Sequence, residues 1–305
     1  MPHLSLYLLG SPHIEMDGSP VEADTRKAIA LLVYLAISGE SHTRDALATL
    51  LWPDYDQSNA RAALRRTLSA LRKGLRQEAL EVRWDSIGLL PGLDHWSDVT
   101  EFRGLLAASA AHGHPPGEAC GDCLPLLSKA VNLYRGDFMA GFTLRDSPNF
   151  DEWQFFEADE LRRELAGALE KLARGDLQAG DFELAIAAAR RWSSLDPLSE
   201  EAHRMLMQCY AGSGQRNAAL RQYCECVRIL EIELGVPPLE ETTALYRSIL
   251  EHGGVAAGRE AAEARETAGR KAGTPEAEPD ERSASPNIHR PGGLPLVGRA
   301  RQMAA

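Results

Sequence analysis

Residues 59–76 read NARAALRRTLSALRKGLR, a basic segment with the periodicity of an amphipathic helix. At about 100° per residue, one side of that helix carries only apolar residues: Ala60, Leu64, Leu68, Leu71 and Leu75. The opposite side and its flank carry cations and one serine: Arg61, Arg65, Arg66, Ser69, Arg72, Lys73 and Arg76. The pattern predicts a helix that packs its leucines on a core and presents its cations to a negative partner.

The charge of this segment is local, because the whole chain has a net charge of -11. One interpretation is a recognition helix for the DNA major groove, where arginines meet phosphates or pair with guanine. The other is the solvated face of an ordinary surface helix, since basic helices of this kind are common. Ser58 or Asn59 is the expected cap of the helix.

The composition predicts a globular protein. A length of 305 residues favours about two domains, and 44% hydrophobic residues are enough for packed cores. No run approaches the roughly 18 apolar residues of a membrane helix, and the first residues lack the basic start of a signal peptide. Five cysteines, an odd number, favour reduced thiols. We therefore expect a cytoplasmic protein without a membrane partner.

The residues before the basic segment predict two strands and two helices. Residues 4–9 and 13–16 have strand-like patterns, and Asp17-Gly18 is a strong hairpin turn signal. Helical periodicity follows over 26–38 and again over 44–52. The residues that cap or stop these helices are Thr25, Thr43 and Pro53.

After the basic helix the sequence predicts a β-hairpin. Residues 80–84 and 87–90 flank Asp85-Ser86, a turn signal. Strands, three helices with a basic third, and then a hairpin are the order of a winged helix. In that fold the hairpin is the wing, and Arg83 and Trp84 near its tip are expected to touch the DNA backbone or minor groove.

Residues 99–250 have almost no strand signal and show helical periodicity throughout. The predicted helices cover 101–111, 124–134, 151–174, 182–195, 200–212 and 217–234. Gly180 and Ala185 recur as Gly214 and Ala219 at a spacing of 34 residues, which is the period of tetratricopeptide (TPR) repeats. The alternative to a TPR-like stack is an unrelated helical bundle.

The predicted fold class is therefore mainly α. An N-terminal winged helix-turn-helix of α/β type, residues 1–98, precedes an all-α TPR-like helical-repeat domain, residues 99–250. Residues 251–293 have few large apolar side chains, and we expect them to form a disordered linker.

Several blocks follow one another in a characteristic order. They are LLGSPHIEMDG, RKAIALLVYLA, RDALATLLWPD, NARAALRRTLSALRKGL, LYRGDFMAGF, FDEW and ELGVPPLEETTALYRSIL. In these blocks residues 1–250 resemble transcriptional activators of the SARP type (Streptomyces antibiotic regulatory proteins). The resemblance implies a response-regulator-type winged helix joined to a bacterial transcriptional activation domain. Residues 294–305 begin with LPLVGRARQ, which resembles the entry to an ATPase module, so we expect the chain to stop before that module.

The resemblance implies sequence-specific binding to double-stranded promoter DNA, self-association of side-by-side protomers on DNA repeats, and contact with RNA polymerase. We expect a transcriptional activator that is not an enzyme and requires no cofactor. One rival function is a TPR-like protein-interaction scaffold without specific DNA binding. Another is a fragment of a nucleotide hydrolase, which the absence of a G-x-x-x-x-G-K-[ST] phosphate loop disfavours.

The predicted DNA contacts divide by role, because phosphate contacts set affinity and register whereas base contacts carry sequence choice. Base or near-base contacts are expected from Arg61, Arg65 and Ser69. Phosphate contacts are expected from Arg66, Arg72, Lys73 and Arg76. Asn59 at the start of the helix and the wing residues Arg83 and Trp84 complete the predicted DNA-binding set.

A second cluster offers metal-binding chemistry. His112, His114, Cys120 and Cys123 place two imidazoles and two thiols within twelve residues, and all four are donors that zinc accepts. One interpretation is a structural zinc site, and the alternative is a polar loop beside buried thiols.

Overall fold

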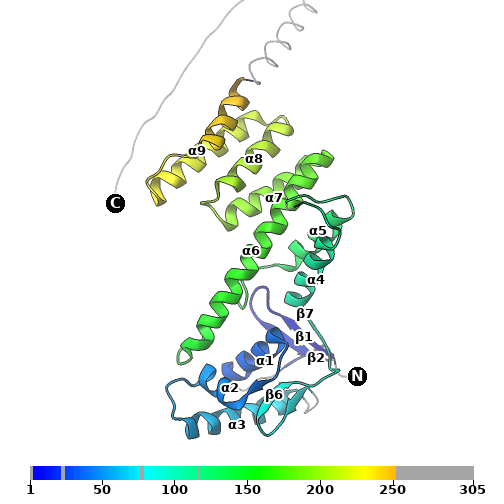
Figure 1. The fold of residues 1–305 in the computed structure, drawn as a ribbon, viewed down its shortest axis with the longest axis vertical. Coiled ribbons are helices and arrows are strands. Elements are labelled where there is room, and N and C mark those ends of the chain that lie inside the picture. Colours follow the sequence, from blue (N-terminus) through cyan, green and yellow to red (C-terminus); the bar gives the residue numbers. More distant parts are fainter. Residues whose placement is uncertain (1–2, 22–24, 76–78, 116, 252–305) are drawn as a thin grey trace, which may run out of the picture. The chain divides into compact units, whose positions relative to one another are not determined.

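The computed structural model describes residues 3–21, 25–75, 79–115 and 117–251. The fold is mainly helical, with a mixed α/β region at the N-terminus and a helical region from α4 (Asp98–Ala110) onward (Figure 1). The predicted fold class is therefore confirmed. Arg76 lies outside the described residues, as do the predicted linker beyond residue 251 and the expected start of an ATPase module at 294–305.

The first sheet has the strand order β3-β2-β1-β7. Strands β1 (His3–Tyr7), β2 (His13–Met16) and β3 (Ser19–Pro20) are antiparallel neighbours. The predicted Asp17-Gly18 turn joins β2 to β3, and both residues have positive φ, 52° and 72°. Strand β7 (Asp94–Ser97) pairs parallel with β1 and was not predicted, because four residues of mixed polarity give no local strand signal.

Three helices follow the first hairpins. Helix α1 (Arg26–Ser38) begins at the predicted cap Thr25, and α2 (Arg44–Leu51) begins at the predicted cap Thr43. Helix α3 (Gln57–Gly74) is the basic helix, and its cap is Asp56 rather than Ser58 or Asn59. The Asp56 carboxylate accepts the backbone N–H groups of residues 58 and 59 at 3.0 and 3.1 Å, so the helix starts two residues earlier than its basic sequence.

The predicted wing is the hairpin of β5 (Leu80–Val82) and β6 (Ser86–Leu89), in which Val82 pairs with Ile87. Strand β4 (His42–Thr43) adds to the other edge of β6 and gives the strand order β4-β6-β5. Gly88 permits this close pairing, since a Cβ there would lie 2.4 Å from Ser41 Oγ.

The remaining described elements are helices. After α4 come α5 (Cys123–Leu133), α6 (Pro148–Ala179), α7 (Phe182–Leu195), α8 (Glu200–Gly212) and α9 (Arg216–Glu233), and residues 240–251 are also helical. Helices α7 and α8 have the predicted bounds. Helix α6 is longer than predicted at both ends, because Pro148 is tolerated in the first helical turn and the helix runs on to the Gly180 cap.

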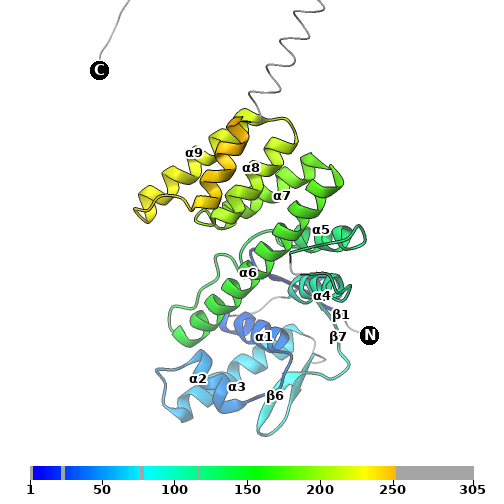
Figure 2. The same ribbon diagram turned by 45° about the horizontal axis from the view of Figure 1, so that its top comes forward.

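The predicted repeat corresponds to two helix pairs, α6–α7 and α8–α9, which stack on one another (Figure 2). Gly180 after α6 and Gly214 after α8 have φ of 84° and 76°. Each turn therefore contains a residue in the left-handed conformation, which favours glycine. Gly212 lets the ring of Phe182 approach closely, since a Cβ at residue 212 would lie 2.8 Å from that ring.

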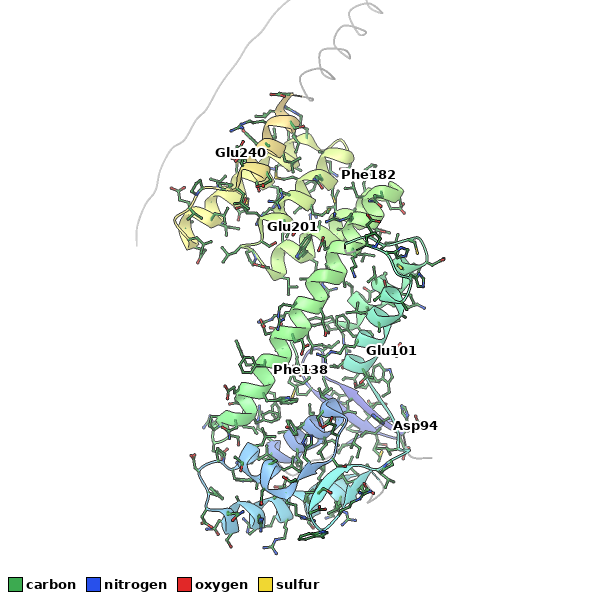
Figure 3. All side chains as sticks on the ribbon, viewed as in Figure 1. Asp94, Glu101, Phe138, Phe182, Glu201 and Glu240 are labelled. Carbon is green, nitrogen blue, oxygen red and sulfur yellow. The ribbon has the colours of Figure 1, made fainter. Side chains whose placement is uncertain are left out.

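The N-terminal region and the helical region share one continuous hydrophobic core. Trp153 of α6 packs its ring at 4.9 Å from Tyr34 of α1 and at 5.8 Å from Phe138, which Figure 3 labels. Ser147 Oγ donates to the backbone oxygen of Leu51 at 2.7 Å. The predicted boundary at residue 98 falls at the first residue of α4, and the division into domains stays a prediction.

Candidate functional site

Helix α3 separates its apolar and basic residues as the sequence predicts. Its buried apolar residues are Ala60, Ala63, Leu64, Leu68 and Leu71, and Leu75 is buried just after the helix. The exposed residues from the predicted set are Asn59, Arg61, Arg65, Arg66, Ser69, Arg72 and Lys73. The leucines anchor the helix on α1 and α2, and the cations remain accessible.

Arg61 differs from the other cations of α3 because it already has a partner. Its guanidinium makes a bidentate ion pair with Asp45 of α2, with both N–O distances at 2.6 Å. Hydrogen bonding from Arg61 lowers the pKa of the Asp45 carboxyl. Both side chains are about half exposed. The Asp45 carboxylate therefore balances the charge of Arg61, while the guanidinium remains accessible to solvent.

Asn59 has a structural partner as well. Its side-chain amide donates to the Asp56 carboxylate, whose pKa is lowered by hydrogen bonds from Asn59. The side chain therefore completes the cap of α3. In contrast, within the described residues no ion pair is formed by Arg65, Arg66, Arg72 or Lys73.

Arg44, which is not among the predicted site residues, connects α2 to the wing. Its Nε and terminal nitrogen donate to the backbone oxygens of Trp84 and Arg83 at 2.9 and 2.8 Å. A cation in the first turn of a helix opposes the helix dipole. Because Arg44 is the first residue of α2, this unfavourable position is the sequence signal that its side chain bonds to a different element.

Two adjacent hollows lie between α3 and the wing, and both are lined by Arg44 and Arg65. The first also includes the Asp45–Arg61 pair, the start of α3 and the wing tip. We call the second the basic groove. Its lining is Arg44, Arg65, Leu68, Ser69, Arg72, Lys73 and Val82, so within the described residues it contains four cations and no carboxylate.

The wing tip presents an aromatic ring to solvent. Trp84 is 89% exposed, and neighbouring Arg83 pairs with Glu81 at 2.9 Å. A tryptophan this exposed is unusual on a surface that binds nothing, and tryptophan is enriched among the residues that contribute most to binding at interfaces. The structure brings four residues of the predicted set together in the basic groove: Arg65, Ser69, Arg72 and Lys73. Trp84 lines the first hollow. Arg66 is exposed and lines neither of the two.

The predicted metal donors also come together. His112 Nδ1 lies 3.5 Å from Cys120 Sγ and 3.3 Å from Cys123 Sγ, and the two sulfur atoms are 3.6 Å apart. One donor atom from each of the four residues, His114 included, lies within 4.8 Å of the others. The hydrogen bond with His112 lowers the pKa of Cys120 to about 6. The cluster could hold a metal ion.

The other three cysteines are not part of this cluster. Burial raises the pKa of Cys209 and that of Cys226 to about 11, which makes both poor nucleophiles. Cys224 is exposed on α9.

Comparison with known proteins identifies the family. The family model "Bacterial transcriptional activator domain" (BTAD) matches residues 97–250. The chain belongs to this family. The match also confirms the SARP-type resemblance, since SARP regulators contain a BTAD. The BTAD of this chain includes the four metal-donor residues, whereas α3 and the wing precede it.

Curated relatives of this chain carry regulator names. The regulatory protein AfsR of Streptomyces coelicolor is 29% identical over 80% of this chain and 24% of its own length. The transcriptional regulatory protein EmbR of Mycobacterium tuberculosis is 28% identical over 81% of this chain and 63% of its own length. The chain thus spans about a quarter of AfsR and under two thirds of EmbR.

A solved structure shares the fold of this BTAD chain. It is Mycobacterium tuberculosis EmbR in complex with a low-affinity phosphopeptide, with a TM-score of 0.61 and 26% sequence identity. The match covers 83% of this chain and 66% of that chain. Among the described residues of the BTAD chain, no helix is both long and apolar enough to cross a lipid bilayer.

Proposed function

We propose that this protein is a transcriptional activator that binds promoter DNA sequence-specifically through α3 and contacts RNA polymerase. The observation that carries the proposal is the basic groove, in which Arg65, Arg72 and Lys73 of α3 lie beside Arg44 of α2. The BTAD match and the regulator names of the relatives support the same function.

Electrostatics explains why a groove is needed. DNA repels a chain with a net charge of -11 at long range, so binding depends on a region where positive charge outweighs negative charge. Each lysine or arginine that neutralises a phosphate releases condensed counterions, which drives association and makes it salt-dependent. The basic groove provides such a region, and the side chains around it are exposed.

Each DNA contact follows from the position of its residue. Arg65 and Ser69, at the centre of the exposed face of α3, are the proposed base-reading residues. Arg66, Arg72 and Lys73 are proposed to hold phosphates, and the wing residues Arg83 and Trp84 to contact the backbone or minor groove. Arg61 is proposed to read bases while sharing its guanidinium with Asp45, which limits its orientation.

A gel-shift titration of the full chain across a salt series tests this function. The probes are the DNA upstream of the gene and a random duplex of the same length. Preferential binding to the upstream DNA supports the proposal. Equal, weak binding to both probes at every salt concentration contradicts it and favours the scaffold alternative.

Replacing Lys73 by alanine should weaken binding to both probes equally. Loss of one phosphate contact should reduce the slope of log K against log salt by about 1. The matched control is Lys129→Ala on α5, an exposed lysine outside the basic groove, which should leave the slope unchanged. If Lys73→Ala weakens binding only to the upstream DNA and not to the random duplex, Lys73 does not act through phosphates.

Replacing Arg65 by alanine should cost about 1–3 kcal/mol on the upstream DNA and relax the preference at one base position. The reason is that a bidentate contact to a base edge is lost together with its discrimination. Binding-site selection with wild-type and variant protein measures the change, with Arg221→Ala on α9 as control. Equal losses on cognate and random DNA would reduce Arg65 to an electrostatic role.

Activation and assembly need their own measurement. Run-off transcription with purified RNA polymerase should rise when the chain is added to a template with two repeats, and should rise less with one repeat. A chain that binds the repeats and leaves transcription unchanged would be a DNA-binding protein without activator function. A response that is independent of repeat number would contradict side-by-side binding.

A further inference from the structure

The loop between α4 and α5 gathers four metal-type donors that DNA binding does not use. It begins after Ala110 at the end of α4 and ends at Cys123, the first residue of α5. Cys123 is fully buried, and its sulfur lies 3.6 Å from the backbone oxygen of Ser109 in α4. The cluster therefore joins the end of one helix to the start of the next.

The spacing of the donor atoms fits a tetrahedral ion. With Zn–S near 2.3 Å and Zn–N near 2.0–2.1 Å, two sulfur ligands lie about 3.8 Å apart and a sulfur and a nitrogen ligand about 3.5 Å apart. The observed separations are 3.6 Å for the sulfur pair and 3.5 and 3.3 Å from the sulfurs to His112 Nδ1. Three of the four donors are therefore already at ligand distances.

The fourth donor is on the same side of the loop. The ring centroids of His112 and His114 are 5.9 Å apart, and a donor atom of each ring lies within 4.8 Å of the cysteine sulfurs. Gly113 between them has a φ of 71°, a left-handed conformation that glycine adopts without strain. This turn lets both imidazoles of an H-x-H pair face the two sulfurs.

We propose that His112, His114, Cys120 and Cys123 bind one Zn²⁺ ion as a structural clip. Thiolate and imidazole ligands select zinc over Mg²⁺ and Ca²⁺, which prefer oxygen. Four protein ligands close the coordination sphere, which is the pattern of structural rather than catalytic zinc. Both thiols lose their protons to solvent on binding, and no oxidation or reduction takes place.

The clip fastens the loop at a place where α5 meets α6. A Cβ at Gly117 of the loop would lie 3.4 Å from the Glu170 carboxylate, and one at Gly175 would lie 2.5 Å from the Leu124 side chain. Two helices and a loop therefore pack closely at this point. A bound ion holds the loop in place there without a larger hydrophobic core.

The first test is the metal content of the untagged full chain, purified without chelator and measured by elemental analysis. We expect one zinc per chain in the wild type and in Cys224→Ser, the control at an exposed cysteine outside the cluster. Cys120→Ser should lower the zinc content to background. Wild-type protein without zinc, or zinc retained in full by Cys120→Ser, overturns the proposal.

Two further measurements separate ligand loss from misfolding. Cobalt substitution should give the d–d bands of a tetrahedral site together with thiolate charge transfer, and an octahedral spectrum would overturn the assignment. His114→Gln changes an exposed residue, so it should keep the wild-type circular dichroism spectrum and bind zinc at least about tenfold more weakly in chelator competition. Unchanged affinity in this variant would remove His114 from the ligand set and overturn the four-ligand site.

A dithiol function is the competing outcome. If freshly purified protein carries a Cys120–Cys123 disulfide and no metal, the cluster is a redox pair and the zinc clip is wrong. If chelator is needed before both thiols react with a thiol reagent, the clip is supported.

Discussion

Removing three cations of the basic groove at once, in the variant Arg65→Ala/Arg72→Ala/Lys73→Ala, should weaken binding to upstream DNA by about 10²–10⁴-fold. The estimate adds about 1–3 kcal/mol for Arg65 to about 1 kcal/mol for each phosphate contact. The salt slope should fall by about 2, since Arg72 and Lys73 are the two proposed phosphate contacts and each lost contact removes about 0.9. Filter binding or fluorescence anisotropy across a salt series measures both values.

The same triple variant should fold normally. The three side chains are exposed and make no ion pair within the described part of the chain, and substitutions of that kind usually change stability by less than about 0.5 kcal/mol. The matched control is Lys129→Ala/Arg163→Ala/Arg221→Ala, which removes equal charge from α5, α6 and α9. If this control weakens DNA binding as much as the groove variant, net charge rather than the groove governs affinity.

Replacing Asp98 by alanine should lower the free energy of unfolding by about 3–5 kcal/mol. Asp98 is 1% exposed at the start of α4. Its two oxygens accept the backbone N–H of Leu8 at 2.8 and 2.9 Å, and one of them accepts that of Leu9 at 3.0 Å. Alanine leaves both N–H groups buried without their acceptor and opens a space beside them.

Denaturant unfolding at pH 7 measures this loss. Burial raises the pKa of Asp98, while hydrogen bonds from Leu8 and Leu9 oppose the rise, so a single pH should be kept throughout. Asp98→Asn keeps one acceptor oxygen, so its free energy of unfolding should fall less than that of Asp98→Ala. Asp94→Ala, at an exposed carboxylate paired with His3, is the control. A loss below about 1 kcal/mol for Asp98→Ala would mean that water satisfies the freed N–H groups.

The elements predicted correctly are those whose signals are local. Thr25 and Thr43 cap α1 and α2 as predicted, because a threonine before a periodic apolar run needs no distant partner. The predicted bounds of α7 and α8 are also correct, because helical periodicity is a local signal. The start of α3 was predicted wrongly, since Asp56, Ser58 and Asn59 are all good caps and the sequence does not say which of them has the extended backbone that Asp56 adopts.

The candidate sites divide in the same manner. Helical periodicity alone predicts that Arg65, Ser69 and Arg72 lie on the exposed face of α3. The spacing of the histidines and cysteines from His112 to Cys123 alone indicates a candidate metal site. Two features depended on contacts between different elements. Arg44 reaches the wing forty residues later, and Asp45 neutralises Arg61 from a different helix.

By itself, the sequence determined most of the helices, the caps of α1 and α2, the amphipathic basic helix and the presence of four metal donors, because hydrophobic periodicity and capping act within a few residues. The tertiary structure decided the parallel pairing of β7 with β1, the anchoring of Leu8 and Leu9 by Asp98, the pairing of Arg61 with Asp45 and the approach of the four donors. Those features require contacts between residues on different elements or across a folded loop, and such contacts exist only once the shared core has brought the elements together.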